Sequence, residues 1–299
     1  MNTPSTERHA ESPGPDTGPG GPHARGGRLN RIVRSPLGWM LTGMVGIGLV
    51  SGLTATGPGP VPALGAVAAV AVYWLVMRRV ARRATPEIAR RGAGREALLG
   101  GALGLGFVLV SVLLITAFGG YSFSWADDGF MAVVWSAVMV QIGAAVTEEL
   151  VFRGLALQAL EQLWGSRAAI VITGLFFGVA HLGAPDANAW SALAIALEAG
   201  VMLGAAFLWR RSIWFVVGLH FAWNTTEQLL GIPVSGHASE GLFTVDVHGP
   251  AVLTGGGFGL EAALVSVVIG VLLAAAMFVL ARRGGRLPPR RSARHTQTG

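Results

Sequence analysis

The chain has 299 residues, of which 52% are hydrophobic and only 13% are charged, and its mean hydropathy is +0.56. Soluble domains carry about 25% charged residues, so this composition excludes an ordinary soluble protein. The formal net charge is +6, but all 22 basic residues are arginines that lie beside apolar stretches, which argues against nucleic acid as a partner. Cysteine is absent, which excludes disulfides, a thiolate zinc site and a cysteine nucleophile.

The two ends of the chain are polar. The first 30 residues are rich in proline and glycine and carry too little apolar surface to order themselves. We therefore expect residues 1–34 and 284–299 to be disordered cytoplasmic tails. No cleavable signal peptide is expected, because the N-terminal region has no short apolar core.

Residues 35–283 contain eight apolar stretches. The clearest, 97–118, has no charged side chain and is long enough to cross a bilayer as a helix. The sequence therefore predicts an all-α, polytopic membrane protein with about eight transmembrane helices. The predicted spans are 37–56, 61–77, 97–118, 130–160, 168–184, 191–209, 212–232 and 258–281.

The arginines indicate an orientation. With the N-terminus in the cytoplasm, 21 of the 22 arginines fall in cytoplasmic segments and none in outer loops. The outer loops instead hold acidic residues: Asp127, Asp128, Asp186, Glu240 and Asp246. This separation predicts a multi-pass plasma-membrane protein with both termini inside. The use of arginine without lysine, with abundant alanine and glycine, is typical of a bacterial protein.

Polar side chains inside the spans are the candidates for function, because a charge within a bilayer normally faces the protein interior. They are Glu148, Glu149 and Arg153 in the fourth span, His181 in the fifth, and His220 and Asn224 in the seventh. Glu149 and Arg153 are four residues apart and are expected to pair, whereas Glu148 is rotated by about 100°. At about 1.5 Å per residue, the three clusters fall at a similar depth.

This set of residues suits hydrolysis. A glutamate can act as general base toward water, and a histidine can orient that water. His220 and Asn224 are able to donate hydrogen bonds to a tetrahedral oxyanion, while Arg153 balances Glu149. Phe177 is expected to pack and not to take part in the chemistry.

The motifs EExxxR, FxxxH and HxxxN, in this order, resemble the signature of the CPBP intramembrane protease family, which includes CAAX prenyl endopeptidases and bacteriocin-immunity relatives. The resemblance covers about residues 130–235, the motif core of the membrane domain, and every motif position is filled. It implies an endopeptidase in which Glu148 activates water with His181, and His220 with Asn224 forms the oxyanion site. The implied partners are the bilayer and a peptide or protein substrate, with or without a lipid, such as a CAAX-like C-terminus.

The metal question stays open at this point, because the family is described both as metalloprotease and as glutamic protease. The chain lacks HExxH, and we favour the metal-independent mechanism with no cofactor. If a divalent metal such as zinc binds, its expected ligands are Glu148, His181 and His220.

Two other functions compete with the protease: an ion- or proton-coupled transporter, and a non-catalytic scaffold or immunity protein. The fourth and fifth spans contain no helix-interrupting proline, which disfavours the transporter, and no motif residue is lost, which disfavours the scaffold. Among the other glutamates, Glu227 and Glu198 are candidates for a direct role in the same site. Pairing of Glu198 with Arg153 is the alternative. Glu261 is expected to face water.

Overall fold

The structure is a computed structural model that describes residues 27, 30–126, 129–238 and 240–287. Most of the two predicted tails, together with Asp127 and Asp128, lies outside these residues.

Helices make up most of the described chain, and three of them contain π-helical segments. In chain order the elements are α2 (Pro36–Thr54), α3 (Val61–Leu75), η1 (Val76–Val80), η2 (Pro86–Ile88), α4 (Ala93–Ala117), β1 (Tyr121–Trp125), α5 (Phe130–Glu149), η3 (Leu150–Leu157), α6 (Gln158–Ala180), η4 (His181–Gly183), α7 (Ala189–Ile195), η5 (Ala196–Val201), α8 (Met202–Arg210), α9 (Ile213–Leu229), β2 (Phe243–Val247), α10 (Ala251–Thr254), η6 (Gly256–Phe258), η7 (Leu260–Ala262) and α11 (Leu264–Arg283). The π-helical segments are η1, η3 and η5.

Six helices of the described chain are long and apolar enough to cross a membrane. One of them, Phe130–Gly183, has 54 residues and contains the fourth predicted span and all but the last residue of the fifth. It bends at Gly165, whose φ of 81° is readily adopted only by glycine. The seventh predicted span corresponds to α9, which has only 17 residues. The count of eight crossings and the cytoplasmic side of the termini stay predictions.

Two local predictions were wrong. The eighth span was placed at 258–281, but 260–262 form a 3-10 turn and α11 begins at Leu264. Gly255 and Gly259 have positive φ values, which break the helix before that point. In addition, two segments predicted as loops pair as antiparallel strands, with Tyr121 opposite Val247 and Trp125 opposite Phe243.

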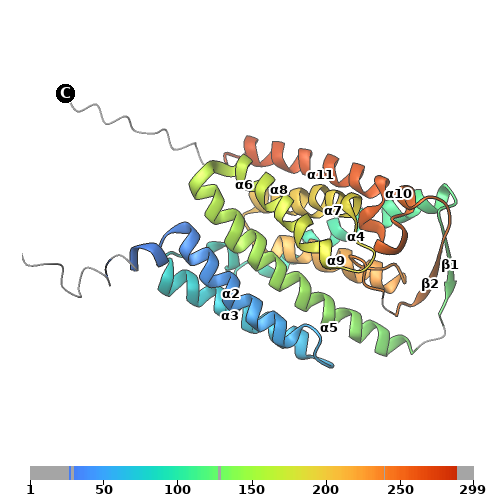
Figure 1. Cartoon of the computed structure of the whole chain (residues 1–299), viewed down its shortest axis with the longest axis horizontal. Helices are drawn as coiled ribbons and strands as arrows, with labels where there is room; N and C mark the ends of the chain where they lie inside the picture. Colours follow the sequence, from blue (N-terminus) through green and yellow to red (C-terminus); the bar gives the residue numbers. More distant parts are fainter. Residues whose placement is uncertain (1–26, 28–29, 127–128, 239, 288–299) are drawn as a thin grey trace, which may run out of the picture.

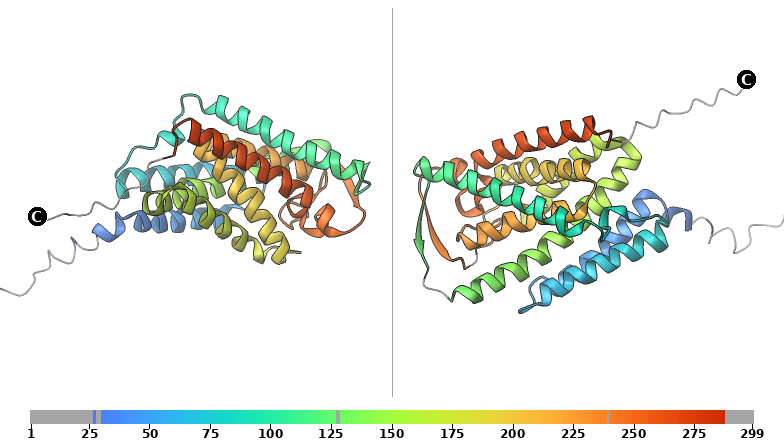
Figure 2. Two further views of the ribbon diagram at one scale, coloured as in Figure 1. Left: turned by 90° about the horizontal axis from the view of Figure 1, so that it is seen from above. Right: turned by 180° about the vertical axis from the view of Figure 1, so that it is seen from behind.

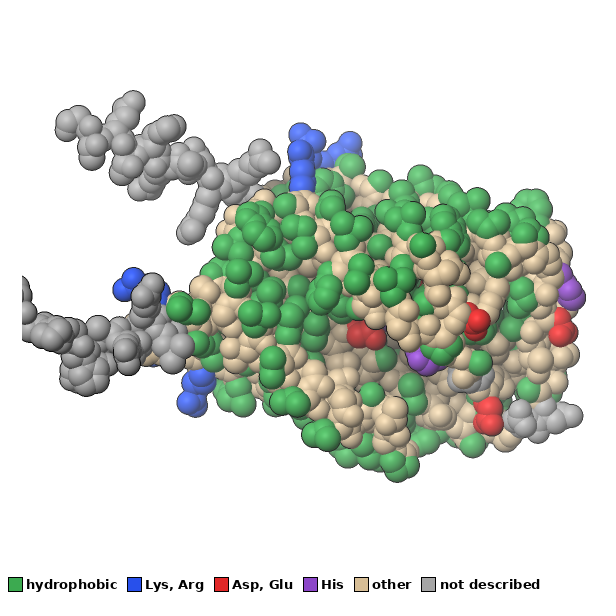
Figure 3. Space-filling model, viewed as in Figure 1, with side chains coloured by type: hydrophobic (Ala, Val, Ile, Leu, Met, Phe, Trp, Pro, Cys, Tyr) green, Lys and Arg blue, Asp and Glu red, His purple; other side chains and the backbone are tan. Residues whose placement is uncertain are grey.

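The helices run along the long axis of the molecule, with the strands at one end and the start of α2 and the end of α11 at the other (Figures 1 and 2). At the latter end Arg211 pairs with Glu161 at 2.6 Å and donates to the carbonyl of Arg286 at 2.7 Å. Arg210 pairs with Glu96 at the same end. The segments predicted to be cytoplasmic therefore share one end of the molecule, and the face in Figure 3 is largely apolar away from it.

Helices α4 and α9 pack closely through glycines. A Cβ atom at Gly100 would meet the carbonyl of Phe215, and one at Gly104 would meet the main chain of Leu219. Small residues permit this approach of two backbones. The contact fixes the position of α9, which carries His220 and Asn224.

Candidate active site

Glu149 is the centre of the buried polar group. It is the last residue of α5 and is fully buried. Its Oε1 accepts hydrogen bonds from Arg153 Nη1 at 2.9 Å and from His220 Nδ1 at 2.8 Å. The predicted Glu149–Arg153 pair is therefore present, and the bond to His220 joins it to α9. Sequence analysis did not predict this bond, because residues 71 positions apart have no spacing rule.

Arg153 also ties two helices together. It lies in the π-helical segment η3 and is 2% exposed. Its Nη2 donates to the carbonyls of Ala199 at 2.7 Å and Gly200 at 3.1 Å, both in the π-helical segment η5. The suggested pairing of Arg153 with Glu198 was wrong, since the guanidinium reaches the neighbouring carbonyls instead. Among the described residues, neither carboxylate oxygen of Glu198 has a hydrogen-bond partner.

His181 approaches this group through Phe177. The two rings are 4.6 Å apart, and the Arg153 guanidinium lies 5.0 Å from the Phe177 ring. Phe177 is 1% exposed, as expected for a packing residue. The Phe177 carbonyl accepts a hydrogen bond from His181 Nδ1 at 2.8 Å. A carbonyl cannot donate, so Nδ1 carries a proton, and Nε2 of the neutral ring is a free acceptor.

Asn224 belongs to a chain of amides that sequence analysis missed. Its Nδ2 donates to Gln141 at 3.2 Å, and Gln141 Nε2 donates to Gln228 at 2.8 Å. Gln141 lies seven residues before Glu148 on α5, and Gln228 lies four after Asn224 on α9. Helical spacing from the motif residues was the signal that would have found both.

Glu148 points away from Glu149, as its position on the helix predicted. It is partly exposed and lines a cavity of about 170 Å³ beside α2 and α3. The other lining residues are Ser51, Thr54, Ala55, Pro62, Val140, Gly143, Ala144 and Thr147. Figure 3 shows acidic and histidine side chains in the middle of a face whose other visible atoms belong to hydrophobic or uncharged residues and the backbone. The Glu148 carboxylate is therefore partly exposed in the wall of this cavity.

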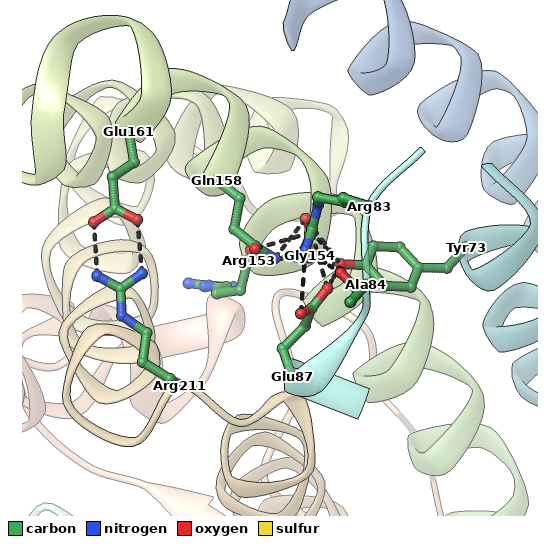
Figure 4. A network of polar contacts seen from close by, with 9 residues as sticks. All are labelled: Tyr73, Arg83, Ala84, Glu87, Arg153, Gly154, Gln158, Glu161 and Arg211. Atoms are coloured by element: carbon green, nitrogen blue, oxygen red, sulfur yellow. Dashed lines mark hydrogen bonds and ion pairs between the residues drawn. The ribbon is translucent and has the colours of Figure 1, made fainter. Parts of the chain in front are cut away.

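A second polar network supports the π-helical segment η3 beside Arg153 (Figure 4). The Gly154 carbonyl accepts from Gln158 Nε2 at 2.8 Å and from the Tyr73 hydroxyl at 3.2 Å. Arg83 Nη2 donates to Gln158 at 3.0 Å and to Glu87 at 2.9 Å. These bonds satisfy a carbonyl in a segment without regular α-helical hydrogen bonding, next to Arg153.

Two further glutamates are buried. Glu227 is fully buried and accepts from Trp223 Nε1 at 2.7 Å. The prediction that Glu261 faces water was wrong, because it is 2% exposed and accepts from the amide of Ser235 at 2.6 Å and its hydroxyl at 2.9 Å. Burial raises the pKa of Glu261 to about 7, against the lowering effect of the two bonds from Ser235.

The conditional metal ligands do not form a ready-made site. No three His, Asp or Glu side chains of the described residues are grouped so as to hold a metal ion. Among the described residues, Glu148, His181 and His220 thus do not converge as ligands of one ion. The prediction that the protein works without a cofactor stays a prediction.

Fold and site together define a multi-pass helical membrane protein with a buried ionic centre. Residues 130–226 match the family model described as type II CAAX prenyl endopeptidase Rce1-like. This confirms the resemblance to the CPBP and CAAX protease family over about one third of the chain, a stretch that includes all six predicted site residues. No curated protein and no solved structure matches the chain.

Proposed function

We propose that this protein is an intramembrane endopeptidase that hydrolyses a peptide bond of a membrane-associated or C-terminal, CAAX-like peptide. The family match supports a protease. The observation that carries the proposal is the different environment of two adjacent carboxylates: Glu149 is buried and bound by Arg153 and His220, while Glu148 lines a cavity. Paired carboxylates with separate environments can take separate roles in one reaction.

Glu148 is the proposed general base. It makes no hydrogen bond to another described side chain, so its carboxylate is free to accept a proton from water. The hydroxide formed attacks the peptide carbonyl carbon, and the carbonyl oxygen becomes an oxyanion. The proton then passes from Glu148 to the leaving nitrogen as the C–N bond breaks. His181 is the proposed partner that orients the water, through the lone pair on its Nε2.

His220 and Asn224 are the proposed oxyanion donors. The ionised Glu149 carboxylate only accepts, so His220 Nδ1 donates to it, and donation from Nε2 requires a second proton on the ring. The contact between Glu149 and His220 has the form of the aspartate–histidine contact in a serine-protease triad, where the carboxylate stabilises the imidazolium. One amide hydrogen of Asn224 is used by Gln141, and the other remains for the oxyanion.

The test is cleavage of internally quenched C-terminal peptides, with and without a lipid, by the purified full chain in detergent. We expect Glu148→Gln and His220→Ala to lower kcat/KM by about 100-fold or more. The matched control is Glu240→Gln, which removes an exposed carboxylate of a loop, and should retain wild-type activity. Thermal unfolding shows whether each variant is folded. Equal residual cleavage by wild type and both site variants contradicts the proposed site, and inhibition by a chelator contradicts the metal-independent mechanism.

A further inference from the structure

A second cavity, separate from the one beside Glu148, lies at the end of α3. Its volume is about 440 Å³. Four of its six lining residues are arginines, and none is acidic; the lining consists of Trp74, Arg78, Arg79, Arg82, Arg83 and Ala84. Four guanidinium groups around one hollow form a site of strong positive potential, which selects for anions.

The backbone is shaped to gather these arginines. Helix α3 passes into the π-helical segment η1, which contains Arg78 and Arg79. Arg82 then adopts a φ of 54°, a conformation that a residue with a long side chain rarely takes. Residues held in such conformations are concentrated at binding and catalytic sites. A run of arginines that only sets the topology of a membrane protein needs no such arrangement, because charge alone is sufficient for that purpose.

Arg83 is held in place, whereas the other three arginines are available. Arg83 is anchored by Glu87 and Gln158, and its guanidinium lies 6.0 Å from the Trp39 ring. In the part of the chain that the structure describes, the guanidinium groups of the exposed Arg78, Arg79 and Arg82 make no hydrogen bond or ion pair. The guanidinium group of Arg78 instead lies over the ring of Trp74, 6.0 Å from its centroid.

The position of the cavity indicates which kind of anion occupies it. The helix that leads to it exposes large apolar side chains, with Val67 69% and Leu75 45% exposed, and such a surface on a membrane helix faces lipid tails. Trp74 lies in the sequence between Val67 and the arginines, at the end of this apolar stretch, as tryptophans do at the interface of a membrane with water. An anion with acyl chains therefore finds partners for both its parts here.

We propose that the cavity lined by Arg78, Arg79, Arg82 and Arg83 binds the phosphate headgroup of an anionic membrane lipid whose acyl chains lie along the exposed face of α3. Guanidinium groups bind phosphate oxygens in a bidentate manner, which adds geometric selection to charge. The same chemistry also fits a free phosphate ion, and the experiment separates the two sources.

The test is calorimetric titration of the detergent-solubilised full chain with dihexanoyl-phosphatidylglycerol. Dihexanoyl-phosphatidylcholine supplies the same acyl chains without net charge, and inorganic phosphate supplies the charge without the chains. The triple variant Arg78→Gln/Arg79→Gln/Arg82→Gln removes the available guanidinium groups and leaves Arg83 with its partners. The matched control, Arg90→Gln/Arg91→Gln/Arg95→Gln, removes the same charge from exposed arginines that do not line the cavity. Thermal unfolding without added lipid tests whether both variants are folded.

Wild type is expected to bind phosphatidylglycerol saturably, and more tightly than either phosphatidylcholine or phosphate. The triple variant should bind it about 100-fold more weakly, because each of the three lost arginines weakens binding by about fivefold. The control variant should change the affinity by less than about threefold. An equal loss in both triple variants shows unspecific attraction to basic charge and overturns the proposal. Equal affinity for phosphatidylcholine overturns it as well, because the net negative charge of the lipid is then not needed. Equal affinity for inorganic phosphate also overturns it, because the acyl chains are then not needed. If the triple variant does not fold, Arg82→Gln alone must still weaken binding more than Arg91→Gln.

Discussion

The ion pair between Glu149 and Arg153 gives the sharpest prediction about stability. The change is Arg153→Met, which keeps much of the side-chain volume but removes the guanidinium. Arg153 is 2% exposed and donates to Glu149, Ala199 and Gly200, so the substitution leaves a buried carboxylate with one donor and two carbonyls with lost partners. Removing one partner of a buried pair lowers the free energy of unfolding by about 3–5 kcal/mol.

The measurement is reversible unfolding of the full chain in mixed micelles, followed by circular dichroism as the fraction of sodium dodecyl sulfate rises. A double-mutant cycle with Glu149→Gln isolates the pair. The double variant carries no buried charge at these two positions, so it should be more stable by about 1–3 kcal/mol than the sum of the single effects predicts. Arg167→Met, at an exposed position, is the control and should change stability by less than about 0.5 kcal/mol. A loss below about 1 kcal/mol for Arg153→Met, or strictly additive effects, would refute the interpretation of this pair as a buried tie.

Three further predictions concern packing, orientation and pH. Gly104→Ala should lower the free energy of unfolding by about 1–3 kcal/mol, because the added methyl group separates α4 from α9. Gly106→Ala, with no atom within 4 Å of the added methyl group, should raise it by up to about 1 kcal/mol. The same unfolding assay checks both variants, and equal effects would contradict the packing argument. Gln141→Leu should lower kcat of peptide cleavage with little change in KM, because Asn224 loses the bond that orients its amide; unchanged kcat would show that this bond has no role. The folded-state pKa of Glu261 is raised to about 7 from an ordinary value of 4.5, so this group should cost the wild type up to about 3 kcal/mol of stability as pH rises from 4.5 through 7. The Glu261→Gln variant should lose less stability over this range, and parallel pH profiles of the two proteins would exclude the assignment.

Prediction from sequence worked best where one helix or one motif carried the information. The pairing of Glu149 with Arg153 follows from a spacing of four residues, and the outward rotation of Glu148 follows from the same helix geometry. It failed where a contact joins distant segments. His220 bonds to Glu149 and Arg153 bonds to carbonyls of η5, and neither contact leaves a periodic trace in the sequence.

Glu261 shows a second kind of failure. Its position near the end of an apolar stretch predicted exposure to water. Turns around Gly255 and Gly259 instead place its carboxylate within hydrogen-bonding distance of Ser235. Hydropathy describes how a segment partitions between lipid and water. It does not describe how the loops at the end of a helix bundle fold over one another.

The sequence by itself indicated that the protein lies in a membrane, and it gave the approximate positions of the helices. It also pointed to the six residues of the candidate site and to the family that they resemble. These properties depend on composition and on spacing within one helix, which are local. The tertiary structure decided that Glu149 joins Arg153 to His220, that Gln141 holds Asn224, and that four arginines surround one cavity. Those arrangements depend on which helices pack together and where π-helical segments shift the register of side chains, and packing between distant segments is a property of the whole chain.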